Sequence, residues 1–249
     1  GRQEDALKMF EVCGERPDYA PVYVSRAFLE KDANPQKALV DYEKALSVGK
    51  DDWKNWYRLA NYYRDRGMPE KVFETASGAA QQFPKDDMVK VLLARADLNN
   101  DRYEECNSVM ANATIIPHEG QRDIRDLFMQ CQVGQALHDM KQHQYNQAIA
   151  HLETSREYPE RLGTGKPDNP DYRIQDYLEM FCYQELGQSV QATEAVARID
   201  AAASHNATEN PESQRVQMEN WYRVTLPTEP EPKSLDVLTS ILGGRRYRH

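Results

Sequence analysis

The chain is poor in cysteine, and the few it has are not arranged as a metal or redox motif. Four cysteines occur among 249 residues, and no two of them form a C-x-x-C pair. This excludes the spacing of zinc ribbons and thioredoxin-like sites. All four lie beside apolar residues in helix-like segments. We therefore expect Cys13, Cys106, Cys131 and Cys182 to be small buried hydrophobes in a reducing compartment, without a disulfide framework.

Long apolar runs are also missing. No stretch approaches the roughly 20 apolar residues of a membrane helix, and the N-terminal GRQEDALKMF lacks the apolar core of a signal peptide. We therefore expect no membrane partner and a cytoplasmic location. The sequence starts without Met inside an amphipathic pattern, so we expect it to be a piece of a longer protein. A targeting signal on an upstream part stays an open alternative.

Basic charge is in deficit. The chain has 31 Lys and Arg against 40 Asp and Glu, which gives a net charge of -9. Nucleic acids and anionic membranes are bound by basic patches, and the one basic run is Arg245, Arg246 and Arg248 in the C-terminal tail. We read that run as a solvated terminus and expect no nucleic-acid partner.

Motifs of catalysis and metal binding are absent from the sequence. It contains no H-E-x-x-H, no H-x-x-x-H pair and no G-x-S-x-G. The run Gly163-Thr-Gly-Lys166 suggests a phosphate loop, but Pro167 follows it and Glu160 stands where a Walker A needs glycine. We predict no catalytic residue, no metal and no cofactor, so the chain is not expected to be an enzyme.

What the sequence does contain is a repeat. Small residues recur at the same place in successive helix-like pairs, at intervals of about 34 residues through Ala38, Val72 and Cys106 and at longer intervals through Ala148 and Ala192. Residues 53–86 carry the pattern best and resemble the tetratricopeptide repeat (TPR) family. The matching positions are Trp56, Leu59, Ala60, Tyr63, Gly67, Val72, Ala76, Ala79 and Pro84.

The repeat predicts an all-α fold: an α-α superhelix, or TPR solenoid, of about five helix pairs plus terminal helices. Pairs must stack because one pair cannot bury its own apolar face. We assign this domain to residues 1–226. Its units are expected at about 1–17, 19–50, 53–84, 87–117, 120–158 and 171–204, with a terminal helix at 211–225. Residues 227–249 are read as a Pro/Glu spacer and a short helix that caps the solenoid or binds another chain.

The TPR resemblance also implies where a partner would bind. First helices of TPR units line a concave groove, and its positions here are Lys54, Tyr57, Asn61, Arg64, Met88, Val91, Arg95 and Leu98. Arg and Tyr are frequent interface anchors, although an ordinary solvated wall is the alternative. Tyr57 and Met88 stand at positions where chaperone-tail receptors of the family carry polar or basic residues, so we do not expect that function.

A second stretch, residues 157–188, has a more specific resemblance. It is similar to the C-terminal TPR region of uncharacterised bacterial proteins in which a galactose-mutarotase-like β-supersandwich lies upstream. The residues that carry this are Pro159, Leu162, Gly163, Gly165, Lys166, Pro167, Tyr183, Leu186 and Gly187.

Two functions follow as expectations. The first is a non-catalytic scaffold that binds a protein or peptide, or its own upstream domain, in the groove. The second is a helical accessory domain of a carbohydrate-associated protein, which helps to form or shield a sugar site. In that case the inter-repeat loop with Gly163, Gly165 and Lys166 would dock on the upstream domain. The oligomeric state stays open.

Overall fold

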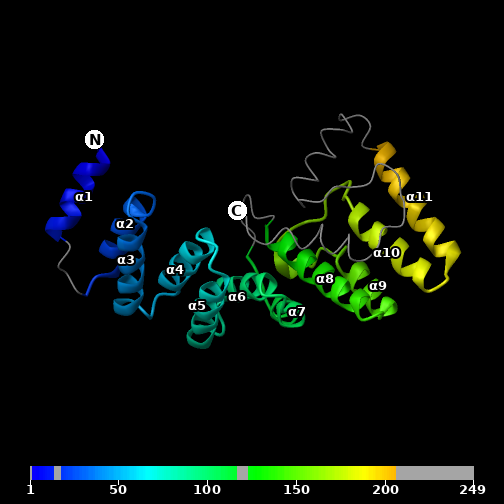
Figure 1. The fold of residues 1–249 in the computed structure, drawn as a ribbon, viewed down its shortest axis with the longest axis horizontal. Helices are drawn as coiled ribbons and strands as arrows, with labels where there is room; N and C mark the ends of the chain where they lie inside the picture. The colour runs from blue at the N-terminus through cyan, green and yellow to red at the C-terminus, as the bar shows by residue number, and fades with distance from the viewer. Residues whose placement is uncertain (1, 14–17, 117–122, 206–249) are drawn as a thin grey trace. The chain divides into compact units, whose positions relative to one another are not determined.

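The computed structural model describes residues 2–13, 18–116 and 123–205. These residues form eleven α-helices and one 3-10 turn, with no strand among them. The predicted all-α fold class is therefore confirmed for the part of the chain that the structure describes (Figure 1). The predicted terminal helix at 211–225 and the segment 227–249 lie outside the described residues.

Packing divides the chain into two units, Gly1–Asn100 and Asp101–His249. The boundary falls inside the predicted repeat at 87–117. In the first unit, α2 packs on α3, α4 packs on α5, and the pairs continue through contacts of α3 with α4 and of α5 with α6. Its helices are α1 (Arg2–Cys13), α2 (Ala20–Glu30), α3 (Pro35–Val48), α4 (Trp53–Asp65), α5 (Pro69–Gln82) and α6 (Asp87–Asn99).

The second unit repeats this arrangement. Helix α7 packs on α8, α8 pairs with α9, α9 contacts α10, and α10 pairs with α11. Short turns make consecutive helices antiparallel neighbours. Its elements are α7 (Tyr103–Ala111), α8 (Asp123–Lys141), α9 (Tyr145–Thr154), the 3-10 turn η1 (Glu160–Leu162), α10 (Arg173–Glu185) and α11 (Ser189–His205).

Polar caps and prolines fix where the helices begin. The Asn34 side chain accepts a hydrogen bond from the Lys37 amide at 3.3 Å, and Pro35 is the first residue of α3. Asp52 caps α4, and Asp86 caps α6 by accepting from two backbone amides. Such caps satisfy amides that have no partner inside the helix. They set the register that places each helical face.

Small residues lie where the helices meet. Ala38, Ala60 and Ala76 in the first unit and Ala148 and Ala195 in the second are at most 1% exposed. A methyl group lets two helix backbones approach closely, while neighbouring tyrosines and leucines fill the wider gaps. The repeat of small residues in the sequence is therefore a repeat of close helix contacts.

Four turns between consecutive helices share one backbone conformation. Gly67, Asp101, His143 and Gly187 all have φ between 57° and 70°, in the left-handed region. Each stands two residues after one helix and two residues before the next. Glycine adopts this conformation without strain, whereas Asp101 and His143 adopt it as non-glycine residues. Their side chains hydrogen-bond the hydroxyls of Tyr103 and Tyr145, respectively.

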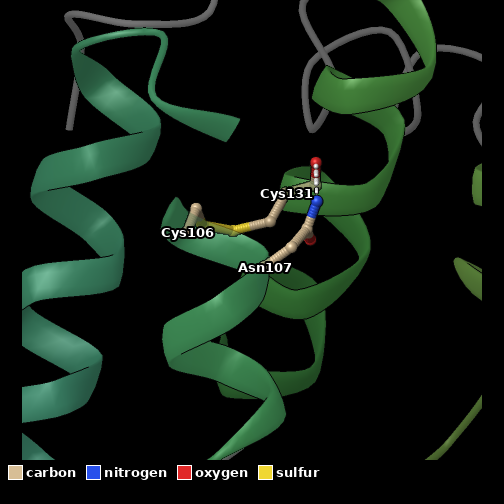
Figure 2. The surroundings of a disulfide bond; sticks show 3 residues. All are labelled: Cys106, Asn107 and Cys131. Carbon is tan, nitrogen blue, oxygen red and sulfur yellow. Dashed lines mark hydrogen bonds between the residues drawn. A yellow bond between two sulfur atoms is a disulfide. The ribbon is translucent and has the colours of Figure 1, made fainter. Parts of the chain in front are cut away.

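One prediction about the cysteines was wrong. Cys106 on α7 and Cys131 on α8 form a disulfide, with 5.8 Å between their Cα atoms (Figure 2). Both residues are fully buried, as expected, but they are not free thiols. Local spacing could not reveal the pair, because the two residues are 25 positions apart and meet only when α7 packs on α8. Because two of the four cysteines form a disulfide, the cysteines do not indicate a reducing compartment.

Candidate functional site

A cavity of about 460 Å³ opens on the first unit, between the end of α2, α3 and the exposed face of α4. Its size is that of an ordinary ligand site rather than of a packing defect. Its walls are formed by Phe28, Lys31, Tyr42, Trp53, Lys54, Tyr57, Arg58, Asn61, Tyr62 and Asp65. We call this cavity the α2–α4 pocket.

Aromatic rings form much of the wall of the α2–α4 pocket. Tyr42 and Tyr62 pack with ring centroids 5.3 Å apart, and Trp53 meets Tyr57 edge to face at 6.0 Å. Phe28 is 61% exposed, so its ring is accessible from solvent. The pocket therefore offers several ring surfaces to an incoming group.

Scaffold contacts fix the position of Tyr62, and Tyr42 is buried beside it. The Tyr62 hydroxyl donates to the Pro35 carbonyl at 2.6 Å, and the Arg66 guanidinium lies 5.2 Å from the Tyr62 ring centroid. Burial raises the pKa of Tyr42, and the Arg58 charge partly opposes this. Tyr42 therefore stays neutral at physiological pH, and the Tyr62 ring is held in place in the wall.

The charged side chains of the pocket are mostly cations. Lys31, Lys54 and Arg58 line it, against one carboxylate, Asp65. Asp65 forms an ion pair with Arg64 at 3.3 Å, outside the lining. Although the whole chain has a net charge of -9, this pocket is locally positive.

The structure brings together three of the residues predicted for the groove. Lys54, Tyr57 and Asn61 all line the α2–α4 pocket, because they stand three and four positions apart on one face of α4. Arg64 follows them along the helix but is exposed and not part of the lining.

The four predicted groove residues on α6 are placed elsewhere. None of Met88, Val91, Arg95 and Leu98 lines the α2–α4 pocket. Met88, Arg95 and Leu98 are half-buried, and Val91 is only 2% exposed.

Sequence reasoning missed several residues of the pocket, among them Phe28, Lys31, Trp53 and Arg58. Two of these come from the preceding helix pair, so a frame counted within one repeat does not reach them. An available signal was the Phe28–Lys31 spacing, which places a ring and a cation on one helix face. In the structure the Lys31 ammonium lies 5.0 Å from the Phe28 ring centroid.

The inter-repeat loop is the second predicted contact region. Gly163 ends the turn η1 with φ 69°, while Gly165 and Lys166 are exposed. Arg161 anchors the start of the loop, because its guanidinium donates to the carbonyls of Met110 and Ala113. The start of the loop, at Arg161, is therefore structural, and the exposed part begins at Gly165.

A buried ion network lies in the same unit. Arg156 and Arg198 each pair with both Asp176 and Glu179 on α10. The two carboxylates are 5% and 2% exposed, and a buried carboxylate without a partner would destabilise the fold. The two positive and two negative charges balance. We therefore interpret the network as a structural contact that holds α10 to α11 and to the end of α9.

In the described ranges, no group of three or more His, Cys, Asp or Glu side chains is arranged to hold a metal ion. Among those ranges, no helix is both long enough and apolar enough to cross a membrane.

Comparisons with known proteins identify no family. No family model matches the chain, and no curated protein matches it. Among solved structures, a tetratricopeptide repeat protein from Parabacteroides merdae ATCC 43184 is 10% identical, covering 97% of this chain and 90% of that one at a TM-score of 0.49.

Two further solved structures are similar at lower TM-scores. PilW, described as a widely conserved type IV pilus biogenesis factor, is 16% identical over 86% of this chain and 87% of its own, at a TM-score of 0.44. Pseudomonas aeruginosa PilF is 14% identical over 96% and 98%, also at 0.44.

The fold is assigned from the helices and their pairwise packing. In its described residues, the chain is an all-α protein of consecutively packed helix pairs, and its first unit carries an aromatic, locally positive pocket.

Proposed function

We propose that the chain is a non-catalytic scaffold that binds a protein or peptide partner at the α2–α4 pocket. The observation that carries this proposal is the convergence of Lys54, Tyr57 and Asn61 with the exposed Phe28 in one cavity. Exposed rings beside cations are typical of interface anchors rather than of a solvated helix face.

Comparative capture of partners tests this function. We would immobilise the intact chain and the Tyr57→Ala, Asn61→Ala double variant, and compare by mass spectrometry what each retains from an extract of the source cells. Lys44→Ala, an exposed position on α3 outside the lining, is the control. We expect a partner that wild type and control retain and the double variant loses. An identical set of retained proteins for all three would overturn the proposal.

A second candidate function concerns the inter-repeat loop. Residues 165–169 are exposed next to the segment that Arg161 anchors. They are available to dock on an upstream sugar-associated domain, as the family resemblance implies. Alanine at Gly165 and Lys166 in the full-length protein tests this. Weaker domain docking or glycan binding would support the accessory role, and unchanged values of both would overturn it.

A further inference from the structure

The cations of the α2–α4 pocket are not neutralised by the protein itself. Within the described part of the chain, Lys31, Lys54 and Arg58 form no salt bridge. Lys31 lies over the Phe28 ring, and Arg58 donates one long hydrogen bond of 3.3 Å to the Asn55 amide oxygen. The one carboxylate of the lining, Asp65, is paired with Arg64 instead. Three converging cations without an ion pair fit an anionic ligand.

The neutral polar groups of the pocket are also available as donors. The Trp53 indole N–H, the Tyr57 hydroxyl and the Asn61 amide line it, and none makes a hydrogen bond to another described residue. Trp56, one turn away, differs: its indole donates to the Lys50 carbonyl at 3.0 Å. The pocket therefore offers mainly donors, and its ligand should supply mainly acceptors.

A proline-containing acidic peptide has this chemistry. Proline has no backbone N–H, and a polyproline II segment leaves its carbonyls free to accept hydrogen bonds. Proline rings dock on aromatic-lined grooves, and the stiff segment loses little entropy on binding. Glutamate side chains between the prolines would supply the anions.

We propose that the α2–α4 pocket binds an acidic, proline-containing peptide segment in the polyproline II conformation. Its carboxylates face Lys31, Lys54 and Arg58, its prolines pack on Trp53, Tyr57 and Phe28, and its carbonyls accept from the free donors. This inference rests on the proposed function and names the class of partner. A single-stranded nucleic acid also has rings and negative charge, but it is bound along an extended basic groove rather than in a pocket of this size.

Fluorescence anisotropy with the intact chain tests the inference. The probes are labelled Glu-Pro-Glu-Pro-Glu-Pro, the same peptide with Gln for Glu, the same peptide with Gly for Pro, and oligo-dT of similar length. We expect the Glu-Pro peptide to bind, and loss of either charge or proline to weaken binding about tenfold. Added salt should weaken the Glu-Pro peptide and leave the Gln-Pro peptide nearly unchanged.

Variants locate the binding. The Lys54→Ala, Arg58→Ala double variant should bind the Glu-Pro peptide about tenfold more weakly. Lys44→Ala with Lys50→Ala makes the same charge change at exposed positions outside the lining and should stay within about twofold of wild type. Tyr57→Phe removes only the hydroxyl and keeps the ring, so it tests the donor even if Tyr57→Ala does not fold.

Several results would overturn the inference: no binding of the Glu-Pro peptide, equal binding of the three peptides, tighter binding of oligo-dT, or an equal effect of both double variants. A partner captured through Tyr57 and Asn61 while the Glu-Pro peptide fails to bind would overturn this inference alone. It would leave the proposed scaffold function intact.

Discussion

At the scale of single residues, burial determines the chemistry of the cysteines. Cys182 is fully buried on α10 and is a free thiol. Desolvation, with a smaller contribution from Glu179, raises its pKa from 9.0 to about 12. Thiolate is the reactive form of cysteine, so this residue is held in its inert form.

We therefore predict that Cys182 resists alkylation in the folded chain. Iodoacetamide at neutral pH, followed by peptide mapping, should leave it unmodified until denaturant is added. Because its folded pKa is raised, its contribution to stability is present below pH 9 and is lost as pH rises towards 12. Modification of Cys182 in native buffer would contradict its burial.

The Cys106–Cys131 disulfide makes a separate prediction. It closes a loop between residues 25 apart, so reducing it should lower the free energy of unfolding by about 3 kcal/mol. Urea titrations with and without dithiothreitol measure the difference. The Cys106→Ser, Cys131→Ser double variant is the control and should not respond to reductant. The same titration midpoint for wild type in both buffers would refute the prediction.

At the scale of elements, the left-handed turns between consecutive helices show which turns a sequence repeat can predict and which it cannot. The sequence marks the turn at Gly67, because glycine at this place is a recognisable signal. It does not mark Asp101 or His143, which adopt the same left-handed φ with side chains that pattern reading treats as ordinary surface. The repeat of backbone conformation is therefore more regular than the repeat of residue type.

This regularity predicts the effect of Gly67→Ala. A Cβ at Gly67 would meet no atom within 4 Å, so the cost arises from φ alone. We expect a loss of about 1 kcal/mol in the free energy of unfolding, measured by urea titration. Gly165→Ala is the matched control: a Cβ there also meets nothing, and its φ is not in the left-handed region. Equal stability of the two variants would show that the left-handed φ at residue 67 costs alanine nothing.

At the scale of the whole chain, periodic features were predictable and non-periodic ones were not. The helix pairs follow from the spacing of small residues and prolines, and three groove residues follow from their common face on α4. The boundary at Asn100–Asp101, the Arg161 anchor on Met110 and the disulfide depend on contacts between residues distant in sequence. No local pattern encodes such contacts.

The α2–α4 pocket shows the same limit. Its α4 wall could be predicted from the repeat, but Phe28, Lys31 and Tyr42 come from the preceding helix pair. Lys31 joins Lys54 and Arg58 of α4 only when those helices are assembled. Overall composition, with a net charge of -9, indicates the opposite.

The indole signals of the chain test most directly whether the α2–α4 pocket is the partner site. The experiment titrates a ¹⁵N-labelled sample with the Glu-Pro peptide. The Trp53 indole N–H lines the pocket with no hydrogen-bond partner among the described residues, whereas the Trp56 indole N–H donates to the Lys50 carbonyl. Trp53→Phe assigns its signal. We predict that the Trp53 indole resonance shifts in a saturable way and that the Trp56 resonance moves much less. Binding of the peptide with the Trp53 resonance unmoved would contradict the account.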